Sequence, residues 1–584
     1  MSLAKSNRPA IEPLNALAGR VRSGTRLSVG GHHYARLPIA LLTRLVDNGA
    51  SDLNYFAWAG GLPLELLLEA NAVSSIDICF SSLDIFGLPP RFRDVAENRR
   101  LPINDWPALA MIQGLRAAQQ NLPFMPVQLP EGSTMMERCQ AVSLHRDQRT
   151  GRTVGLVEAQ VIDTVLLHAP RADTEGNIEI YGARALDLPI VGAARQVLVT
   201  VDEIVPAGTL RSNGRQTIIT RNLITAIAQV PGGAYPTSCL PHYATDFARI
   251  RDILDGKHGT LRQALEKPAD APPANLAKAA RTRPEQVVPG PFRNSTPHPA
   301  APTVDELMVV RIARMLDNES FASAGAVSPL GNVAFRLAKA THAPDLYIGT
   351  FSCGHVDVQA GTMTLSLLEA MDAGSAVSHN GGDDTYSTYY QAGIVTHEII
   401  GAAQIDARGR TNNLELTKPS GGKLRLPGQG GMSDVANMHR NYVVYVPRHG
   451  KASLVESVEI VSSARGIISA TEREKVGYQS GDIYLVTNLC VFRYDEGVGQ
   501  LVVVETMPGV ARDSIIDETG FKVLFAEDCK EMAAPTAEEL RVLRDEIDPL
   551  GIRRLEFVGA RDRGALLDEI LQRDWRGTAA IVDG

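Results

Sequence analysis

The densest group of reactive side chains in the sequence lies in residues 350–357. Within this run, TFSCGHVD, the chain carries a hydroxyl on Ser352, a thiol on Cys353, an imidazole on His355 and a carboxylate on Asp357. The run differs from the G-x-S-x-G turn of serine hydrolases by a threonine at the first glycine, so a serine nucleophile is a minor hypothesis. Cys353 could act as a nucleophile if His355 lowers its pKa, but a small buried cysteine is the interpretation we favour.

Two glycine-rich turns could hold a ligand against the backbone. The first, SVGGHHYARLP at 28–38, places Gly30 and Gly31 between a strand and a helix, and the second, RLPGQGGMSDVA at 425–436, contains Gly428, Gly430 and Gly431. Backbone N–H groups in such turns can bind an anion or a thioester oxygen. A tight structural turn and a surface loop are the competing interpretations. Neither run is a dinucleotide or nucleoside-triphosphate motif.

Composition excludes several functional classes. The formal net charge of −8 argues against a nucleic-acid groove, and no apolar run is long enough to span a membrane. The first residues lack the layout of a signal peptide, which predicts a cytoplasmic protein. The 6 cysteines contain no C-x-x-C pair, so we expect neither a metal site nor a disulfide framework.

The elements that must position these residues occur twice. Residues 37–61 align without a gap on residues 330–354, and residues 168–177 match 402–412 through Asp173/Asp406 and Gly176/Gly409. The Asp and Gly of each pair fit the first and fourth positions of a type I turn, which predicts a structural role for them. Each echo closes on a similar expected strand, at 202–205 and at 458–461. Two echoes in the same order predict two like domains with a site between them.

The division between the halves is marked by proline. Nine of the 34 prolines fall between Pro268 and Pro302, which predicts an extended linker. We therefore expect one domain at 1–265, a linker at 266–303, and a second domain at 304–584 that ends in a helical tail after about residue 555. Strands alternate with helices in both halves, so the predicted fold class is α/β with two open sheets and ligands at the carboxyl ends of their strands.

Several motifs resemble family I CoA-transferases of the glutaconate CoA-transferase type, with the α and β subunits fused. The first half carries SVGGHHYARLP, NLPFMPV (121–127) and PGGAYPTSCLPHY (231–243), and the second carries THAPDL (341–346), GAAQIDARG (401–409), GQGGMSD (428–434) and EIDP (546–549). The resemblance implies two tandem domains of the CoA-transferase fold and an active site in the cleft between the halves.

The resemblance also implies where the catalytic carboxylate should lie. In the family a β-subunit glutamate attacks the thioester and later holds CoA as a glutamyl thioester. Its position here is Phe351, followed by Ser352, and the nearest downstream carboxylate is Asp357. The second half also resembles the β subunit of steroid-ring-opening CoA-ester hydrolases, which use a glutamate of the α-like subunit. That position is Ala108 here, with Asp105 three residues away.

The sequence therefore predicts a CoA-transferase-like enzyme that moves CoA between an acyl-CoA and a carboxylic acid. Its expected CoA-binding residues are Gly30, Gly31, His32, Gly428, Gln429, Gly430 and Gly431. A CoA-ester hydrolase, with Asp105, Asp357 or His355 as base, and a CoA-ester binding protein without transferase activity are the alternatives. Coenzyme A is expected as a substrate, with no permanently bound cofactor or metal, and the fused chain as a homo-oligomer, such as a dimer.

Overall fold

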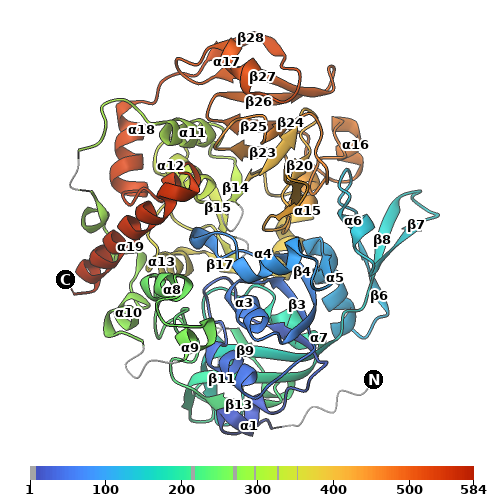
Figure 1. Cartoon of the computed structure of the whole chain (residues 1–584), viewed down its shortest axis with the longest axis vertical. Coiled ribbons are helices and arrows are strands. Elements are labelled where there is room, and N and C mark those ends of the chain that lie inside the picture. The colour runs from blue at the N-terminus through green and yellow to red at the C-terminus, as the bar shows by residue number, and fades with distance from the viewer. Residues whose placement is uncertain are drawn as a thin grey trace.

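Two large mixed sheets, one in each half of the chain, organise the molecule (Figure 1). The computed structural model describes residues 8–211, 217–266, 272–294, 297–324, 328–350 and 353–583. The first sheet runs in the order β1 (Ala10–Ile11), β13 (Ala226–Gln229), β11 (Ala194–Val205), β9 (Ile162–Asp173), β2 (Arg26–Val29), β3 (Leu53–Ala59), β4 (Val73–Phe80), β5 (Ile103–Asp105), with β10 (Ile178–Ile180) beside β9 and β12 (Thr217–Ile219) beside β10. The second runs in the order β17 (Ser378–His379), β16 (His355–Val356), β15 (Tyr347–Thr350), β14 (Phe321–Ala324), β18 (His397–Gly401), β23 (Asn441–Val446), β25 (Ile483–Thr487), β26 (Cys490–Asp495), β27 (Gln500–Thr506), β28 (Phe525–Glu531).

The sheets repeat the same core, as the sequence predicts. The order β13-β11-β9-β2-β3 in the first half recurs as β25-β23-β18-β14-β15 in the second. Helix α2 (Ile39–Asp47) follows β2, and α12 (Pro329–Ala340) follows β14, each with a buried apolar face. The fold class, two similar open-sheet α/β domains in tandem, is confirmed.

The repeated turns match in detail. The carboxylate of Asp173 accepts hydrogen bonds from the amides of Glu175 and Asn177, and that of Asp406 accepts them from Arg408 and Arg410. In each turn the glycine amide donates to the aspartate carbonyl, at 2.9 Å. These carboxylates are occupied within their own turns, so the predicted structural role is confirmed.

One predicted strand is wrong. Residues 458–461 do not form a strand, and the counterpart of the end of β11 is β24 (Leu454–Val455). The register shows this, because Val455 pairs with Asp406 in the second half as Val205 pairs with Asp173 in the first. A turn at residues 447–453 separates β24 from β23 (Asn441–Val446), whereas β11 is continuous.

The halves differ most where the reactive run lies. In the first half β3 is followed by a helix and by β4, which lies parallel to it. In the second half the next partner of β15 is the antiparallel β16. Thr350 and His355 of the reactive run are thus paired across these two strands.

The proline-rich segment is not an extended linker over its described residues. It contains the helix α10 (Ala274–Ala279) and two 3₁₀ turns, and Leu276 and Phe292 are fully buried. These apolar side chains pack with the long C-terminal helix α19 (Ala560–Asp583), which is the predicted helical tail (Figure 1). Apolar anchors between the prolines therefore dock the segment onto the body of the protein.

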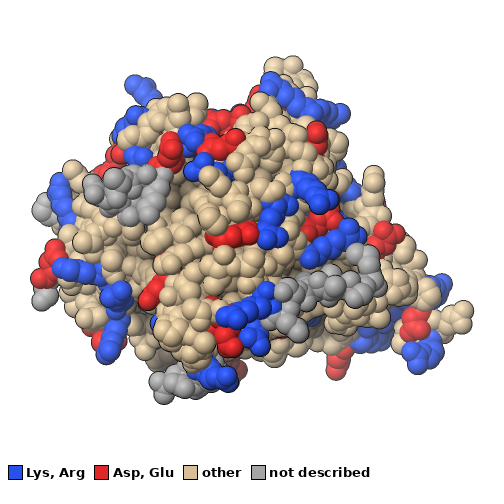
Figure 2. Space-filling model, turned by 90° about the horizontal axis from the view of Figure 1, so that it is seen from below, with Lys and Arg blue, Asp and Glu red and all other residues tan. Residues whose placement is uncertain are grey.

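The surface shows mixed charge. On the face seen in Figure 2, basic and acidic side chains are interspersed over largely uncharged surface. In the described ranges, none of the 6 cysteines forms a disulfide, and no helix is long and apolar enough to cross a membrane.

Candidate active site

A cavity of about 630 Å³ lies between the two halves. The first half contributes His32, Trp58, Phe80 and Leu88, and the second half supplies the remaining lining residues, among them Ser328, Tyr386, Tyr390, Glu398, Tyr445, Arg448, Glu556 and Arg563. The loop 427–431 forms part of the wall. A cavity at a domain boundary that combines an apolar lining with a few polar groups is typical of a ligand site.

One end of the cavity is aromatic. The rings of His32 and Trp58 lie 5.8 Å apart, those of Trp58 and Tyr386 5.9 Å, and those of Tyr386 and Tyr390 4.7 Å. Burial, with His33 and Arg36 nearby, lowers the pKa of His32 well below its usual value, so the ring is neutral. Its Nε2 has no hydrogen-bond partner among the described residues and is available to a ligand.

The glycines of the first turn shape the loop but do not offer free amides. The amide of Gly30 donates to the carbonyl of Leu166, and that of Gly31 donates to Asp187 at 2.8 Å. Gly31 has a φ of +80°, a conformation that glycine adopts without strain. Since both N–H groups are satisfied, this pair positions His32 rather than binding a ligand oxygen directly.

The second glycine turn docks across the boundary between the halves. Ser81 at the end of β4 donates its amide to the carbonyl of Pro427, and Gly430 donates its own to Cys79. The side chain of Gln429 donates to the carbonyl of Trp106 at 2.8 Å. Of the described residues, none accepts from the amide of Gly431, which lines the cavity. The glycines of this loop therefore allow close approach of the other half.

Glu398 is a buried carboxyl group among the residues that line the cavity. It sits on β18, is 4% exposed and lines the cavity. Burial raises its pKa to about 8, opposed only by a hydrogen bond from Ser323. Its Oε2 has no hydrogen-bond partner in the described ranges, and the nearest imidazole, that of His439, is 3.4 Å away and held neutral by burial and by Arg465 and Arg473. A buried, weakly satisfied carboxyl group in a cavity is typical of an acid–base or nucleophilic residue.

The internal repeat of the sequence contains a signal for Glu398. Ser323 pairs with Glu398 in the second sheet as Ser28 pairs with Val165 in the first. When the alignment of Asp173 with Asp406 is continued upstream, Glu398 therefore aligns with this buried valine. A carboxyl group at a core position of the repeat indicates a functional replacement, because its burial costs stability.

The other end of the cavity is polar. Glu556 accepts from the hydroxyl of Tyr445 at 2.7 Å and from the amide of Leu330 at 2.8 Å, and burial raises its pKa to about 7. Arg563 is half-buried and donates to the carbonyl of Ile85, and Arg448 is exposed. Over the described residues neither arginine forms an ion pair, which leaves two positive charges for an anionic ligand.

The described reactive residues of the run 350–357 do not line this cavity. Among the described lining residues there is no Cys353, His355 or Asp357. His355 is buried, and burial together with His379 and Arg184 lowers its pKa to about 3, while Asp357 accepts from Lys339 at 3.0 Å. The predicted positions Phe351 and Ser352 lie outside the described residues. Cys353, His355 and Asp357 are therefore not placed to contact a ligand in the cavity.

Asp105 has a partner that the sequence did not suggest. Its carboxylate forms a two-pronged ion pair with Arg425 of the second half, at 3.0 and 2.5 Å, and both side chains are buried. A carboxylate that binds a guanidinium with both oxygens is engaged in a structural contact. The arrangement argues against Asp105 as a general base.

Comparisons with known proteins agree with the duplicated fold. A model of the family described as coenzyme A transferase matches residues 12–218 and, again, 308–518. The chain is 28% identical over 246 residues to one of the subunits of 3-oxoadipate CoA-transferase of Pseudomonas knackmussii, covering 42% of this chain and 93% of the relative. It is 26% identical over 257 residues to one of the subunits of glutaconate CoA-transferase of Acidaminococcus fermentans, covering 41% and 80%.

Two further matches bear on the alternatives and on the whole chain. The IpdA subunit of the cholesterol ring-cleaving hydrolase of Mycobacterium tuberculosis is 27% identical over 244 residues, covering 40% of this chain and 83% of the relative. The structure of an acyl-CoA transferase of Escherichia coli O157:H7, a thioester complex with CoA, covers 90% of this chain and 96% of its own, with a TM-score of 0.64 at 15% identity. That similarity supports the fold. Because the family model matches well over half of the chain, in both halves, the chain belongs to the coenzyme A transferase family, with its two domains fused in tandem.

Proposed function

We propose that this enzyme transfers coenzyme A between an acyl-CoA thioester and a carboxylic acid in the cavity between its halves. Membership of the family and the relatives named as CoA-transferases support the reaction. The single observation that supports this cavity as the site is Glu398, whose Oε2 has no hydrogen-bond partner among the described residues. The proposed catalytic carboxylate thus comes from β18 and not from the family position at Phe351.

The two ends of the cavity suggest an orientation for the substrate. Arg448 and Arg563 would face the phosphates of CoA, because guanidinium groups without ion pairs bind phosphate well. The pantetheine arm would pass the loop 427–431, where the amide of Gly431 faces the cavity. The acyl group would then lie among His32, Trp58 and Tyr386, beside Glu398.

The proposed reaction balances with one carboxylate. Ionised Glu398 attacks the thioester carbonyl, which forms a mixed anhydride and releases the CoA thiolate. The thiolate attacks the glutamyl carbonyl, which gives a glutamyl-CoA thioester and frees the original carboxylate. The acceptor acid then repeats the two steps in reverse and leaves as its CoA ester. His32, neutral and free at Nε2, would donate a hydrogen bond to the thioester oxygen as negative charge develops.

Hydrolysis of a CoA ester is the second candidate. The pKa of Glu398, about 8, is also suited to a general base that activates water, and one relative is a ring-cleaving hydrolase. In that reaction the thioester loses CoA without a covalent enzyme intermediate.

A mass measurement separates the candidates. The full chain is incubated with a panel of acyl-CoAs and its intact mass is recorded, together with free CoA. We expect an adduct of CoA mass on the wild-type chain, mapped by digestion to the peptide that contains Glu398, and none on Glu398→Gln. Release of CoA without an adduct supports hydrolysis, and binding with neither outcome contradicts both reactions. An adduct on another peptide contradicts the role of Glu398.

We further propose that the fused chain forms a homodimer. The relatives are named as subunits, and the small sheet of β6 (Phe124–Val127), β7 (Val142–Arg146) and β8 (Thr153–Glu158) projects from the body (Figure 1). Phe124 is 46% exposed and Leu144 68% exposed. Light scattering of the purified chain measures the mass, and a monomer would contradict the proposal.

A further inference from the structure

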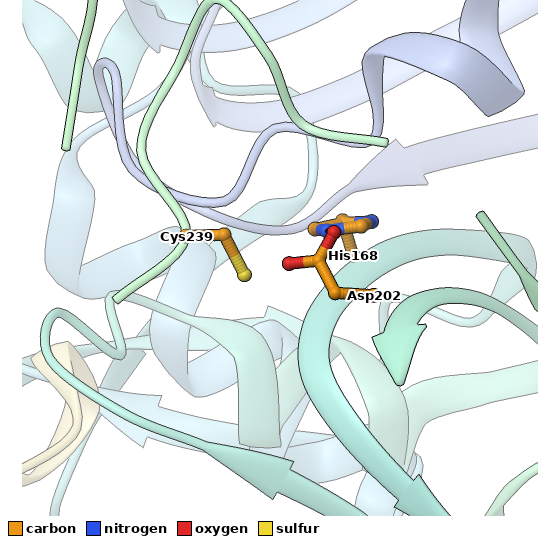
Figure 3. Close-up of side chains that lie close together, drawn as sticks. All are labelled: His168, Asp202 and Cys239. Carbon is orange, nitrogen blue, oxygen red and sulfur yellow. The ribbon is translucent and has the colours of Figure 1, made fainter. Parts of the chain in front are cut away.

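A second cluster of chemically reactive side chains lies in the first half, outside the cavity. His168 on β9, Asp202 on β11 and Cys239 in the turn after β13 are each buried, and one ligand atom from each lies within 4.8 Å of the others. Figure 3 shows the imidazole and the carboxylate side by side, with the thiol on the near side of the same space. An imidazole, a carboxylate and a thiol are the three common types of zinc ligand.

The hydrogen bonds of His168 fix its tautomer. The hydroxyl of Thr200 donates to the carbonyl of Leu167 at 3.3 Å, so it accepts the proton of His168 Nδ1, which lies 2.9 Å away. With Nδ1 as the donor, the nitrogen that can offer a lone pair to a metal is Nε2. A hydrogen bond to Nδ1 that leaves Nε2 free is the usual arrangement around a metal-bound histidine.

This lone pair faces another acceptor. His168 Nε2 lies 3.5 Å from Oδ1 of Asp202, and neither atom carries a proton in this tautomer. Oδ1 accepts the amide proton of Gly232, and the hydroxyl of Tyr243, at 3.4 Å from Oδ1 and 3.5 Å from Nε2, can supply only one of them. A metal ion between Nε2 and Oδ1 would bind both of these buried atoms at once.

The second oxygen of Asp202 is also unsatisfied. Within the described ranges, Oδ2 has no hydrogen bond of normal geometry, although His242 Nδ1 lies 3.3 Å away. The carboxylate is 6% exposed, so water does not replace the missing partner. Oδ2 of Asp202 is thus placed to bind a ligand on the side of the cluster that His242 borders.

We propose that His168, Asp202 and Cys239 bind one Zn²⁺ ion. Ligand atoms around tetrahedral zinc lie roughly 3.3–3.8 Å apart, given bonds of about 2.0–2.3 Å, so the side chains need only small shifts. Binding breaks the S–H bond of Cys239, and its proton leaves to solvent. Zinc with one thiolate, one carboxylate and one neutral imidazole has no net charge, which makes burial favourable. His242 or a water molecule completes the tetrahedron.

The ion would brace the loop that carries His32. Ser238, next to Cys239, donates its amide to the carbonyl of Tyr34 and accepts the amide of Arg36. The turn 232–243 is thereby joined to the residues that follow His32 at the cavity wall. A zinc ion tying this turn to β9 and β11 would therefore stabilise the active-site loop without contacting the substrate.

Metal content is the direct test. The purified full chain is stripped with a chelator, loaded with Zn²⁺ or Co²⁺, and freed of excess metal. We expect about one equivalent per chain, and a thiolate-to-cobalt charge-transfer band that reports the Cys239 ligand. Zinc should also raise the Tm of the stripped chain, because an ion that binds only the folded state stabilises it.

Two variants locate the ion. Cys239→Ser should lose the cobalt band and bind zinc at least tenfold more weakly, whereas Cys490→Ser, which alters an equally buried cysteine in the other half, should keep both properties. Asp202→Asn preserves the shape of the cluster and should also weaken binding if Cys239→Ser fails to fold. The proposal is overturned if the stripped wild-type chain binds no zinc and its Tm is unchanged, since a proton on His168 then satisfies the cluster. A cobalt band that survives Cys239→Ser and disappears in Cys490→Ser also overturns it.

Discussion

Glu398 shows how one residue can turn a duplicated fold into a site. The first half carries Val165 at the same strand position, fully buried, and the second half carries a carboxyl group with one free oxygen. Burying a carboxyl group without full hydrogen bonding costs stability, so a structural role is a poor explanation for it. Its position among aromatic rings at the cavity provides the functional one.

Replacing Glu398 should abolish most of the activity. We expect Glu398→Gln to lower kcat by about 10²–10⁴-fold, because the amide cannot act as nucleophile or base. In the wild type, kcat/KM should rise with pH and level off above about 8, as the carboxyl group ionises. Glu369→Gln is the matched control. Its pKa is also raised, to about 7, but it bonds to Ser238 and does not line the cavity, so this pH profile should remain.

Stability should respond to the same residue with a defined sign. The folded pKa of Glu398, about 8, lies above the usual value of 4.5 for a glutamate, so the folded state holds its proton more tightly than the unfolded state. Its contribution to stability is complete below the unfolded pKa and is lost as pH rises through about 8. Urea unfolding of Glu398→Gln should therefore show a smaller loss of stability between pH 5 and pH 8 than the wild type. Parallel curves for the two proteins would show that the pKa is not raised.

At the scale of elements, the glycines of the loop 427–431 allow neighbouring groups to approach the backbone closely. The sequence suggested that these glycines let a ligand approach the backbone. In the structure they first let β4 and the ring of Tyr386 approach, since a Cβ on Gly428 would contact the backbone of Cys79 and one on Gly431 would overlap the Tyr386 hydroxyl. The loop is therefore part of the contact between the halves as well as part of the cavity.

This crowding gives a rescue experiment. Gly431→Ala should destabilise the chain by about 1–3 kcal/mol and raise the KM for acyl-CoA, because the new methyl group collides with the hydroxyl of Tyr386. Tyr386→Phe removes that oxygen, so the double variant should regain much of the stability lost in Gly431→Ala. The backbone at Gly431, with a φ of −93°, is compatible with alanine. Unfolding curves of the four proteins measure the coupling, and strictly additive effects would contradict it.

Much of the element order was predictable from the sequence, and the reasons for the failures are specific. Alternating strands and helices, proline before α2 and glycine after it, and the Asp–Gly turns are local signals, and the structure confirms them. The prediction of a strand at 458–461 was wrong because sequence similarity does not define strand register. Pairing with β19 (Gln404–Asp406) sets the register in the structure. The prediction of an extended linker was wrong because apolar side chains of α10 pack against α19, which lies almost 300 residues later in the chain.

The cavity was less predictable because it is built from both halves. Sequence motifs located the glycine turns and His32. The hydrogen-bond partners of Gly30, Gly31 and Asp105, however, lie more than 130 residues away in the chain. The cluster of His168, Asp202 and Cys239 could not be predicted from the sequence for the same reason, since its three residues come from β9, β11 and a distant turn. Pairing at this distance leaves no spacing pattern in the sequence.

At the scale of the molecule, a buried ion pair and a helix cap join the halves. Arg425 binds Asp105, and the carboxylate of Asp434 accepts from the amide of Leu109 at the start of α5 (Ala108–Gln119). Both contacts cross from the second half to the first. The halves therefore act as one folded body around the cavity, in agreement with its lining.

The ion pair can be tested apart from the chemistry. Asp105→Asn should destabilise the chain by about 3–5 kcal/mol, because it leaves the buried guanidinium of Arg425 without its charge partner. A double variant, Asp105→Leu with Arg425→Met, should recover part of this loss. The pH dependence of kcat/KM should not change in any variant that folds. A shifted profile would restore Asp105 as a candidate base.

The C-terminal segment should determine how well CoA itself is held. Arg563 at the start of α19 and Arg448 face the cavity without ion pairs in the described ranges, and Arg563 also bonds to the first half through Ile85. If these charges bind the phosphates of CoA, Arg563→Gln should raise the KM for an acyl-CoA about tenfold, since a charge-assisted hydrogen bond contributes about 1.5–3 kcal/mol. The KM for the corresponding acyl-pantetheine, which has no phosphate, should stay the same. The wild-type KM for acyl-CoA should also rise with salt, because screening weakens exposed charge pairs. Equal effects of Arg563→Gln on both substrates would mean that the residue supports the fold of the cavity wall instead of the phosphates.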